Sequence, residues 1–177
     1  KRISKQDERA EVIRLLREVR MSEPERRIDQ YPHELSGGMK QRAMIAMAIS
    51  CNPKLIIADE PTTALDVTMQ ARISELLRQM RETHGTAVLL ITHDLGVVAE
   101  TADDVVVMYA GRVAEQADVR SLFAKPLHPY TIGLFRSLPR VDRSENRLEE
   151  IPGNVPSPTK FPSGCRFRTR CPLAAAK

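Results

Sequence analysis

The fold is decided by residues 35–60, LSGGMKQRAMIAMAISCNPKLIIADE. Residues 39–50 lack strand character and predict a buried helix, with Gly37-Gly38 at its start. The apolar run at 55–58 then leads directly into Asp59-Glu60. A short, continuous apolar run of this kind is typical of a strand that is buried on both faces of a parallel sheet.

Further helices and strands alternate around this segment. Residues 7–21 and 67–83 carry apolar side chains at helical spacing and predict two amphipathic helices. Residues 87–91 predict a second buried strand, which is followed by a short helix over 95–101 and a hairpin over 105–114. This alternation indicates an α/β fold with parallel pairing, and such sheets bind ligands at the carboxyl ends of their strands.

Length and composition exclude several classes of protein. Of the 177 residues, 42% are hydrophobic and 28% are charged, so the chain can bury a core and is not disordered throughout. Its longest apolar run, residues 43–49, is far shorter than the roughly 20 residues that span a bilayer. The three cysteines make an odd number, and nothing at the start of the chain predicts secretion. We therefore expect a reducing compartment and no disulfide scaffold.

Charge is distributed unevenly along the chain. Residues 1–118 hold 16 Lys+Arg and 19 Asp+Glu, whereas residues 119–177 hold 11 and 4, together with eight of the twelve prolines. This change predicts a boundary near residue 118 and a basic, proline-rich second segment. Such a segment can bind a phosphate-rich partner or pack as a solvated extension on its neighbour. We favour the extension and expect no nucleic-acid partner, because few aromatic residues accompany the basic ones.

Three motifs carry candidate chemistry, and each has an ordinary structural alternative. Ser36-Gly37-Gly38 opens a helix, where free N–H groups suit a phosphate, although serine also caps helices. At the end of the first strand, Asp59 can hold Mg²⁺ through water and Glu60 can polarise a water molecule. Acid pairs are also common where loops begin. His93 can donate a hydrogen bond to a phosphate, or it can be a purely structural residue.

In their order and spacing, these motifs resemble the second half of an ABC-type ATPase. Residues 35–39, which we call the signature segment, match the family signature LSGGQ except that Met39 replaces the usual Gln. The other matches are the Walker B strand, the D-loop and the switch histidine, at residues 55–60, 64–66 and 93. The resemblance implies a P-loop NTPase-like parallel sheet with flanking helices.

The resemblance also implies a role for each site residue in a full-length protein. Asp59 would orient Mg²⁺, Glu60 would polarise the attacking water, and His93 would hold the γ-phosphate of ATP. The residues implied to bind the ATP of a second subunit or to link the two sites are Ser36, Gly37, Gly38, Met39 and Asp66. Two ATPase subunits would face head to tail, as peripheral proteins at the cytoplasmic face of the membrane. There they would drive membrane permease subunits.

The proline-rich segment resembles the C-terminal extension of oligopeptide/dipeptide permease ATPases. The matching residues are His128-Pro129-Tyr130-Thr131, Leu138-Pro139, Ile151-Pro152-Gly153 and residues 162–167 and 170–172. The resemblance implies transport of peptides or related solutes, and it places Cys165 and Cys171 among cysteines associated with an iron–sulfur cluster. Two thiols alone cannot complete a four-ligand site. Cys51, among Ala and Ile, is predicted to be a small core residue.

The chain contains no P-loop of the form G-x-x-x-x-G-K-[ST]. Since the family places this motif before the signature, we expect the chain to be the C-terminal part of a longer protein. Residues 1–118 would end an ATP-binding domain, with a helical part at 1–52 and a core at 53–118, and 119–177 would be an irregular, truncated extension. Two other functions stay open: a non-catalytic interaction or iron–sulfur module for the chain alone, and an ABC-type ATPase that acts on DNA.

Overall fold

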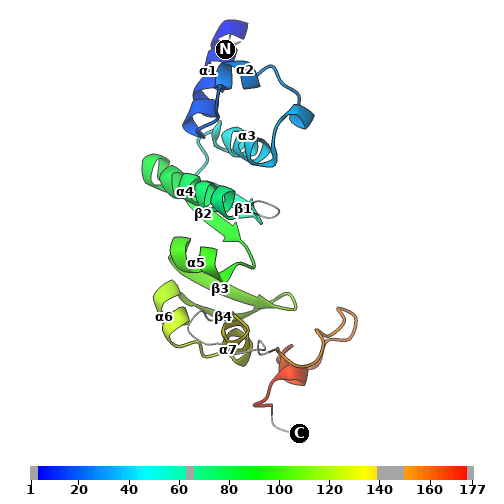
Figure 1. Ribbon diagram of the computed structural model, residues 1–177. Coiled ribbons are helices and arrows are strands. Elements are labelled where there is room, and N and C mark those ends of the chain that lie inside the picture. The colour runs from blue at the N-terminus through cyan, green and yellow to red at the C-terminus, as the bar shows by residue number, and fades with distance from the viewer. Residues whose placement is uncertain (1–3, 63–65, 139–149, 175–177) are drawn as a thin grey trace. The chain divides into compact units, whose positions relative to one another are not determined.

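The chain divides between Val97 and Val98 into two units, Lys1–Val97 and Val98–Lys177. We call them the N-terminal and C-terminal units and describe each by itself. The computed structural model, shown in Figure 1, describes residues 4–62, 66–138 and 150–174. The change in charge composition near residue 118 lies later in the chain than this division. The hairpin predicted at 105–114 therefore lies in the C-terminal unit.

The N-terminal unit consists of helices followed by a β-α-β arrangement. In chain order its elements are α1 (Lys5–Glu18), α2 (Pro24–Arg27), the short helical turn η1 (Pro32–Glu34), α3 (Gly37–Ile49), β1 (Leu55–Asp59), α4 (Val67–His84), β2 (Ala87–Ile91) and α5 (Leu95–Thr101), which runs across the boundary. β1 and β2 are parallel, and α4 makes the crossover that parallel strands require. This confirms the α/β fold and the parallel pairing.

The core of the N-terminal unit lies where α1, α3, α4 and one face of β1 meet. Its buried apolar side chains are Leu15, Leu16, Val19, Met21, Ile45, Ala46, Ile49, Ile56, Ala58, Ile73, Leu76, Leu77 and Met80. On α4 these side chains recur every three or four residues, so the helix turns one apolar face to the core. Burying a large side chain of this kind stabilises the fold by about 1.5–3 kcal/mol.

The prediction that β1 is buried on both faces is wrong. Ile56 and Ala58 are buried, whereas Leu55 and Ile57, which point the other way, are 52% and 62% exposed. Among the residues that the structure describes, helices pack against only one side of the β1–β2 pair. Successive side chains of a strand point to opposite faces, and therefore only alternate residues of the apolar run are buried.

The prediction that α3 is a buried helix is also wrong in part. One face packs in the core, but Met44 and Met47 are exposed. Cys51, which follows the helix, is an exposed free thiol rather than a core residue. α3 therefore carries more apolar side chains than the other described residues cover.

The C-terminal unit is built on an antiparallel hairpin. Its elements are β3 (Asp104–Tyr109), β4 (Arg112–Asp118), α6 (Val119–Ala124), α7 (Pro129–Arg136) and the short helical turn η2 (Arg168–Arg170). Ala110 and Gly111 join the strands with positive φ angles of 48° and 76°, as in the tight turns whose twist suits a hairpin. The extension is thus less irregular than predicted, because two helices follow the hairpin. Within the described parts of the chain, no helix has the length and apolar character needed to cross a membrane.

Aromatic side chains anchor the end of the chain to this hairpin. Phe167 is 2% exposed, and its ring centroid lies 5.2 Å from that of Tyr109 and 5.5 Å from that of Tyr130. Arg170 adds hydrogen bonds to the carbonyl oxygens of Ile151 (2.7 Å) and Pro152 (2.8 Å). A buried ring in edge and tilted contacts contributes more than its area alone. The extension is therefore packed on the hairpin by ring contacts of Phe167 and by hydrogen bonds of Arg170.

Arg42 joins α3 to the end of α1. It is largely buried, and its Nη1 donates to the carbonyl oxygens of Val19 (2.5 Å) and Arg20 (3.3 Å). Carbonyl groups at the end of a helix lack partners within it and carry the negative end of its dipole, so a guanidinium satisfies them well. Burial, and then the charges of Arg72 and Arg20, lower the pKa of Arg42, yet an arginine keeps its proton in proteins.

Replacing Arg42 with methionine should destabilise the protein, because carbonyl oxygens at the end of α1 would lose their donor. We expect the free energy of unfolding to fall by about 2–3 kcal/mol, as for hydrogen bonds to a charged group. Urea denaturation followed by circular dichroism measures it. Arg78→Met is the matched control, since Arg78 pairs with Glu75 and Glu82 on an exposed face and should matter far less. Equal losses in the two variants would contradict the anchoring role.

Candidate functional site

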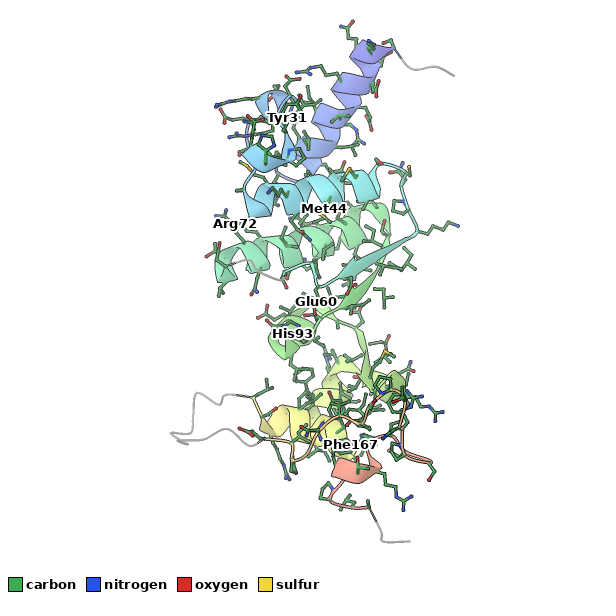
Figure 2. The ribbon with its side chains drawn as sticks, turned by 90° about the vertical axis from the view of Figure 1, so that its right-hand side faces the viewer. Tyr31, Met44, Glu60, Arg72, His93 and Phe167 are labelled. Carbon is green, nitrogen blue, oxygen red and sulfur yellow. The ribbon has the colours of Figure 1, made fainter. Side chains whose placement is uncertain are left out.

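The candidate site lies at the carboxyl ends of β1 and β2. The backbone N–H of Glu60 donates to the carbonyl oxygen of Ile91 (2.9 Å), which continues the pairing of the strands one residue beyond Asp59. The side chain of Glu60 then meets His93, whose Nδ1 lies 3.2 Å from Oε1 of Glu60 (Figure 2). The structure therefore brings together the two residues that the resemblance marks as catalytic.

Glu60 adopts an unusual backbone conformation. Its φ angle of 44° is in the left-handed region, which costs a residue other than glycine roughly 1–3 kcal/mol. The hydrogen bond to Ile91 helps to hold this conformation. Strained residues persist where the surrounding structure fixes them, and they are concentrated at functional sites. The backbone at Glu60 thus supports a functional interpretation of this position.

The contact between Glu60 and His93 sets the roles of the imidazole nitrogens. An ionised carboxylate only accepts hydrogen bonds, so Nδ1 of His93 donates when Glu60 is charged. In a neutral ring Nε2 is then an acceptor, and it becomes a donor only when the ring is protonated. The His93 side chain is 80% exposed, so Nε2 is open to a ligand from solvent. Donation from Nε2 to a phosphate therefore requires the imidazolium form.

Asp59 is exposed at the last position of β1. A single carboxylate suits Mg²⁺, because this ion keeps several of its waters and binds phosphate oxygens. Asp59 therefore fits the predicted metal role, with water and phosphate oxygens as the other ligands. Across residues 4–62, 66–138 and 150–174, no group of three or more His, Cys, Asp or Glu side chains could hold a metal ion.

The signature segment forms the start of α3. Oγ of Ser36 accepts a hydrogen bond from the backbone N–H of Met39 (3.4 Å), so this serine does cap the helix. The first N–H groups of a helix, here including those of Gly37 and Gly38, have no partner within it. Together with the positive end of the helix dipole, they can face an anion.

Gly38 contacts a side chain of α4. Gly38 is buried, and a Cβ added there would lie 2.0 Å from Cε of Met69 on α4. A side chain of the same unit therefore fills the space beside Gly38. A side chain at this position would therefore have to displace the end of Met69.

The start of α4 carries the last of the predicted site residues. Asp66 is the N-cap, and its Oδ1 accepts from the backbone N–H of Met69 (2.9 Å). The side chain of Gln70 donates to the carbonyl oxygen of Thr62 (3.3 Å), in the loop that follows β1. Residues 64 and 65 of the predicted D-loop lie outside the described residues. No motif of the sequence marks Met69 and Gln70, and their one signal is a spacing of three and four residues from Asp66.

The two cysteines of the extension do not form a metal site with other described residues. Cys165 is exposed, Cys171 is half-buried, and both are free thiols. They flank the turn η2, where the N–H of Arg168 donates to the carbonyl oxygen of Cys165 (3.0 Å). An iron–sulfur cluster is held by four ligands, so nothing in the described chain supports the cluster that the resemblance implies.

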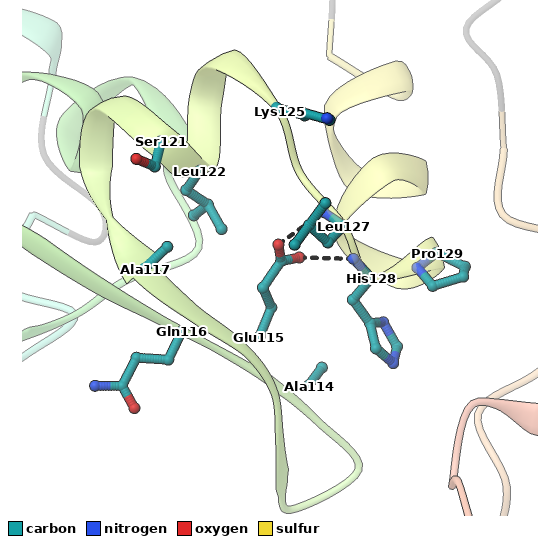
Figure 3. A pocket seen from close by; sticks show the side chains of 10 residues that line it. All are labelled: Ala114, Glu115, Gln116, Ala117, Ser121, Leu122, Lys125, Leu127, His128 and Pro129. Carbon is teal, nitrogen blue, oxygen red and sulfur yellow. Dashed lines mark hydrogen bonds between the residues drawn. The ribbon is translucent and has the colours of Figure 1, made fainter.

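A hollow of about 410 Å³ lies in the C-terminal unit between β4, α6 and α7 (Figure 3). Glu115 lines it, and its carboxylate accepts from the backbone N–H groups of Leu127 (2.7 Å) and His128 (3.0 Å). Burial disfavours ionisation of this carboxyl, but hydrogen bonds, including these two, outweigh it and lower the pKa of Glu115 from 4.5. Both carboxylate oxygens thus bind the backbone between α6 and α7, so Glu115 is a structural residue of this hollow.

Two known protein families match this chain, one at each end. Residues 1–63 match the family described as "ABC transporter". Residues 114–177 match the family described as "Oligopeptide/dipeptide transporter, C-terminal region". These are the two families that the motifs resemble.

Comparison with individual proteins agrees. The chain is 57% identical over 174 residues to a probable peptide ABC transporter ATP-binding protein, y4tR, of Sinorhizobium fredii, with coverage of 98% of this chain and 52% of that protein. It is 54% identical over 177 residues to the oligopeptide transport ATP-binding protein AppD of Bacillus subtilis, with coverage of 100% and 54%. The chain thus spans about half the length of the curated relatives it matches.

Solved structures confirm the fold class. The dimeric ATP-binding cassette MJ0796, in a post-hydrolysis state bound to ADP and Pi, has a TM-score of 0.60 with this chain at 32% identity. The match covers 68% of this chain and 50% of that one.

Asp66→Ala should destabilise the protein by about 1 kcal/mol, because it removes the side-chain acceptor that caps α4. Thermal unfolding measures the change. Asp66→Asn is the matched variant, since it keeps a side-chain oxygen and removes only the charge. It should retain most of the stability. If the asparagine variant lost as much as the alanine variant, capping would not be what this side chain contributes.

Glu115→Gln should lower stability at neutral pH and weaken its dependence on acid. A carboxyl whose pKa is lower in the folded than in the unfolded state stabilises the fold above the unfolded pKa, and this contribution is lost as the pH falls through the folded pKa. The difference in urea midpoint from the unmodified chain should be largest at about pH 6–7 and shrink below about pH 4. The exposed Glu150, as Glu150→Gln, is the control. A difference that is constant with pH would refute the assignment.

Proposed function

Because this chain belongs to the ATP-binding proteins of oligopeptide-type ABC transporters, we propose that the protein it is part of hydrolyses ATP to drive peptide transport across a membrane. The observation that carries the catalytic part is the contact of Glu60 with His93 at the end of the β1–β2 pair. The names of the relatives, which are peptide and oligopeptide transport proteins, support the class of solute.

In the proposed reaction Glu60 polarises the water that attacks the γ-phosphate of ATP. Its backbone is held by Ile91 and its Oε1 by His93, so the carboxylate is oriented before the substrate binds. The protonated ring of His93 donates from Nε2 to the γ-phosphate. Asp59 would hold Mg²⁺, and the ion would supply neutralisation of charge on the phosphates.

The signature segment is proposed to act on the nucleotide of a second ATPase subunit. Ser36 and Gly37 are exposed at the start of α3, where free N–H groups and the helix dipole attract a phosphate. Met39 lies in the same turn, and Asp66 is exposed at the start of α4, from where it would link the two sites. A pair of subunits is supported by the dimeric cassette with which this chain shares its fold, and the head-to-tail arrangement is what the family resemblance implies.

The proposed partners in the membrane are permease subunits. The names of the relatives describe ATP-binding proteins of transporters, so a peripheral position at the cytoplasmic face fits them. Transport proteins, rather than proteins that act on DNA, are the relatives reported above, and the family match at residues 114–177 is to a transporter region. We therefore favour transport over the DNA-acting alternative.

For the 177 residues alone, a non-catalytic interaction module is the competing proposal. The observation that favours it is the lack of a P-loop sequence, which supplies the main cradle for a nucleotide's phosphates. A titration of the isolated chain with ATP separates the two proposals. Weak or undetectable binding would fit a module whose nucleotide site is completed by other residues, whereas tight binding would contradict it.

In the complete protein, Glu60→Gln should abolish turnover and leave ATP binding intact. We expect kcat to fall by about 10²–10⁴-fold, the contribution of a general base. Phosphate release gives kcat, and equilibrium binding of a labelled nucleotide gives the affinity. Glu82→Gln, at an exposed position of α4, is the matched control and should keep its activity. Unimpaired hydrolysis in Glu60→Gln would rule out the role given to Glu60.

A further inference from the structure

Met69 contacts two of the segments that the proposed function uses. Its backbone N–H donates to Oδ1 of Asp66 (2.9 Å) in the first turn of α4. Its side chain crosses to α3, where a Cβ added to Gly38 would lie 2.0 Å from Cε, 3.5 Å from Sδ and 3.8 Å from Cγ. One residue therefore joins the cap of α4 to the signature segment.

The side-chain contact joins a glycine at one end to the flexible thioether of a methionine at the other. Gly38 is buried and Met69 is half-buried, so the contact lies at the edge of the core. The thioether of methionine is unbranched and fills irregular gaps that branched side chains do not fit. Arg72, one turn along α4, lies beside it, with Nη1 4.0 Å from Sδ. The side chain of Met69 is therefore held by contacts with both α3 and α4.

Gln70 ties the same turn of α4 to the loop after β1. Its Nε2 donates to the carbonyl oxygen of Thr62 (3.3 Å), a residue that is only 6% exposed. Thr62 follows Glu60 by two residues. The first turns of α4 therefore contact the loop beside the catalytic carboxylate as well as the start of α3.

We propose that Met69 is a positioning residue for ATP hydrolysis. It holds the signature segment in a fixed relation to Asp66 and, through the first turns of α4, to the loop that carries Glu60. The inference rests on the proposed function, because it concerns the same site. Met69 acts through Gly38 and Asp66, and an error of about 1 Å in such a position can cost about 10²-fold in rate.

The test compares Met69→Ala with Met69→Leu in the complete ATPase. The alanine variant leaves a cavity beside Gly38, so kcat should fall by about tenfold or more per folded molecule, whereas Leu has nearly the volume of Met and should restore most of the rate. ATP affinity of the separate subunit should change by less than about twofold, because the signature segment is proposed to contact a partner's nucleotide. If Met69→Ala fails to fold, Met69→Val is measured in its place.

Met47→Ala is the matched control, since it makes the same chemical change at an exposed position of α3. An unchanged kcat in Met69→Ala, an equal loss in Met47→Ala, or no rescue by Met69→Leu would each overturn the inference. An unmodified protein that does not hydrolyse ATP would instead overturn the proposed function.

A second measurement tests the contact without reference to ATP. Gly38→Ala adds a methyl group that would lie 2.0 Å from Cε of Met69, so the end of this side chain must move aside. In the Met69→Ala background the atoms that meet the methyl group are gone, so Gly38→Ala should change the melting temperature clearly more favourably there than in the unmodified chain. Equal shifts in the two backgrounds would show that the two residues are not coupled, and they would overturn the inference whether or not the protein is an ATPase.

Discussion

The parallel pairing of β1 with β2 is the constraint on which the candidate site depends. Parallel strands end at the same edge of a sheet, so residues that follow them meet there although they lie far apart in sequence. The hydrogen bond from Glu60 to Ile91 carries the pairing one residue further and fixes the left-handed turn of the chain. Glu60 and His93 can then share a hydrogen bond across that edge.

The start of α3 is placed by contacts with two other helices as well as by its own N-cap. Arg42 binds the carbonyl oxygens at the end of α1, and Met69 packs on Gly38 from α4. These contacts come from two different helices and act on the first two turns of α3. A helix held at both points presents its first N–H groups in a defined direction, which is what recognition of an anion by backbone groups requires.

Much of the fold and of the edge of the sheet could be predicted from the sequence, because local patterns carry that information. The apolar runs before Asp59 and Thr92 indicate strands, and the helix between them indicates that they run parallel. Burial could not be predicted in the same way, since Ile57 and Met47 are apolar whether or not another segment covers them. The hydrogen bonds of Arg42 and the contact of Met69 with Gly38 join segments distant in sequence, and such pairs leave no local pattern.

The uncovered side of the β1–β2 pair has a consequence for the behaviour of this chain in solution. Leu55, Ile57, Leu89 and Ile91 form one layer there, each between 46% and 62% exposed. Neighbouring apolar side chains on an open sheet attract similar surfaces, because association removes them from water. We therefore expect two copies of the isolated chain to associate through this layer at high concentration and to separate on dilution.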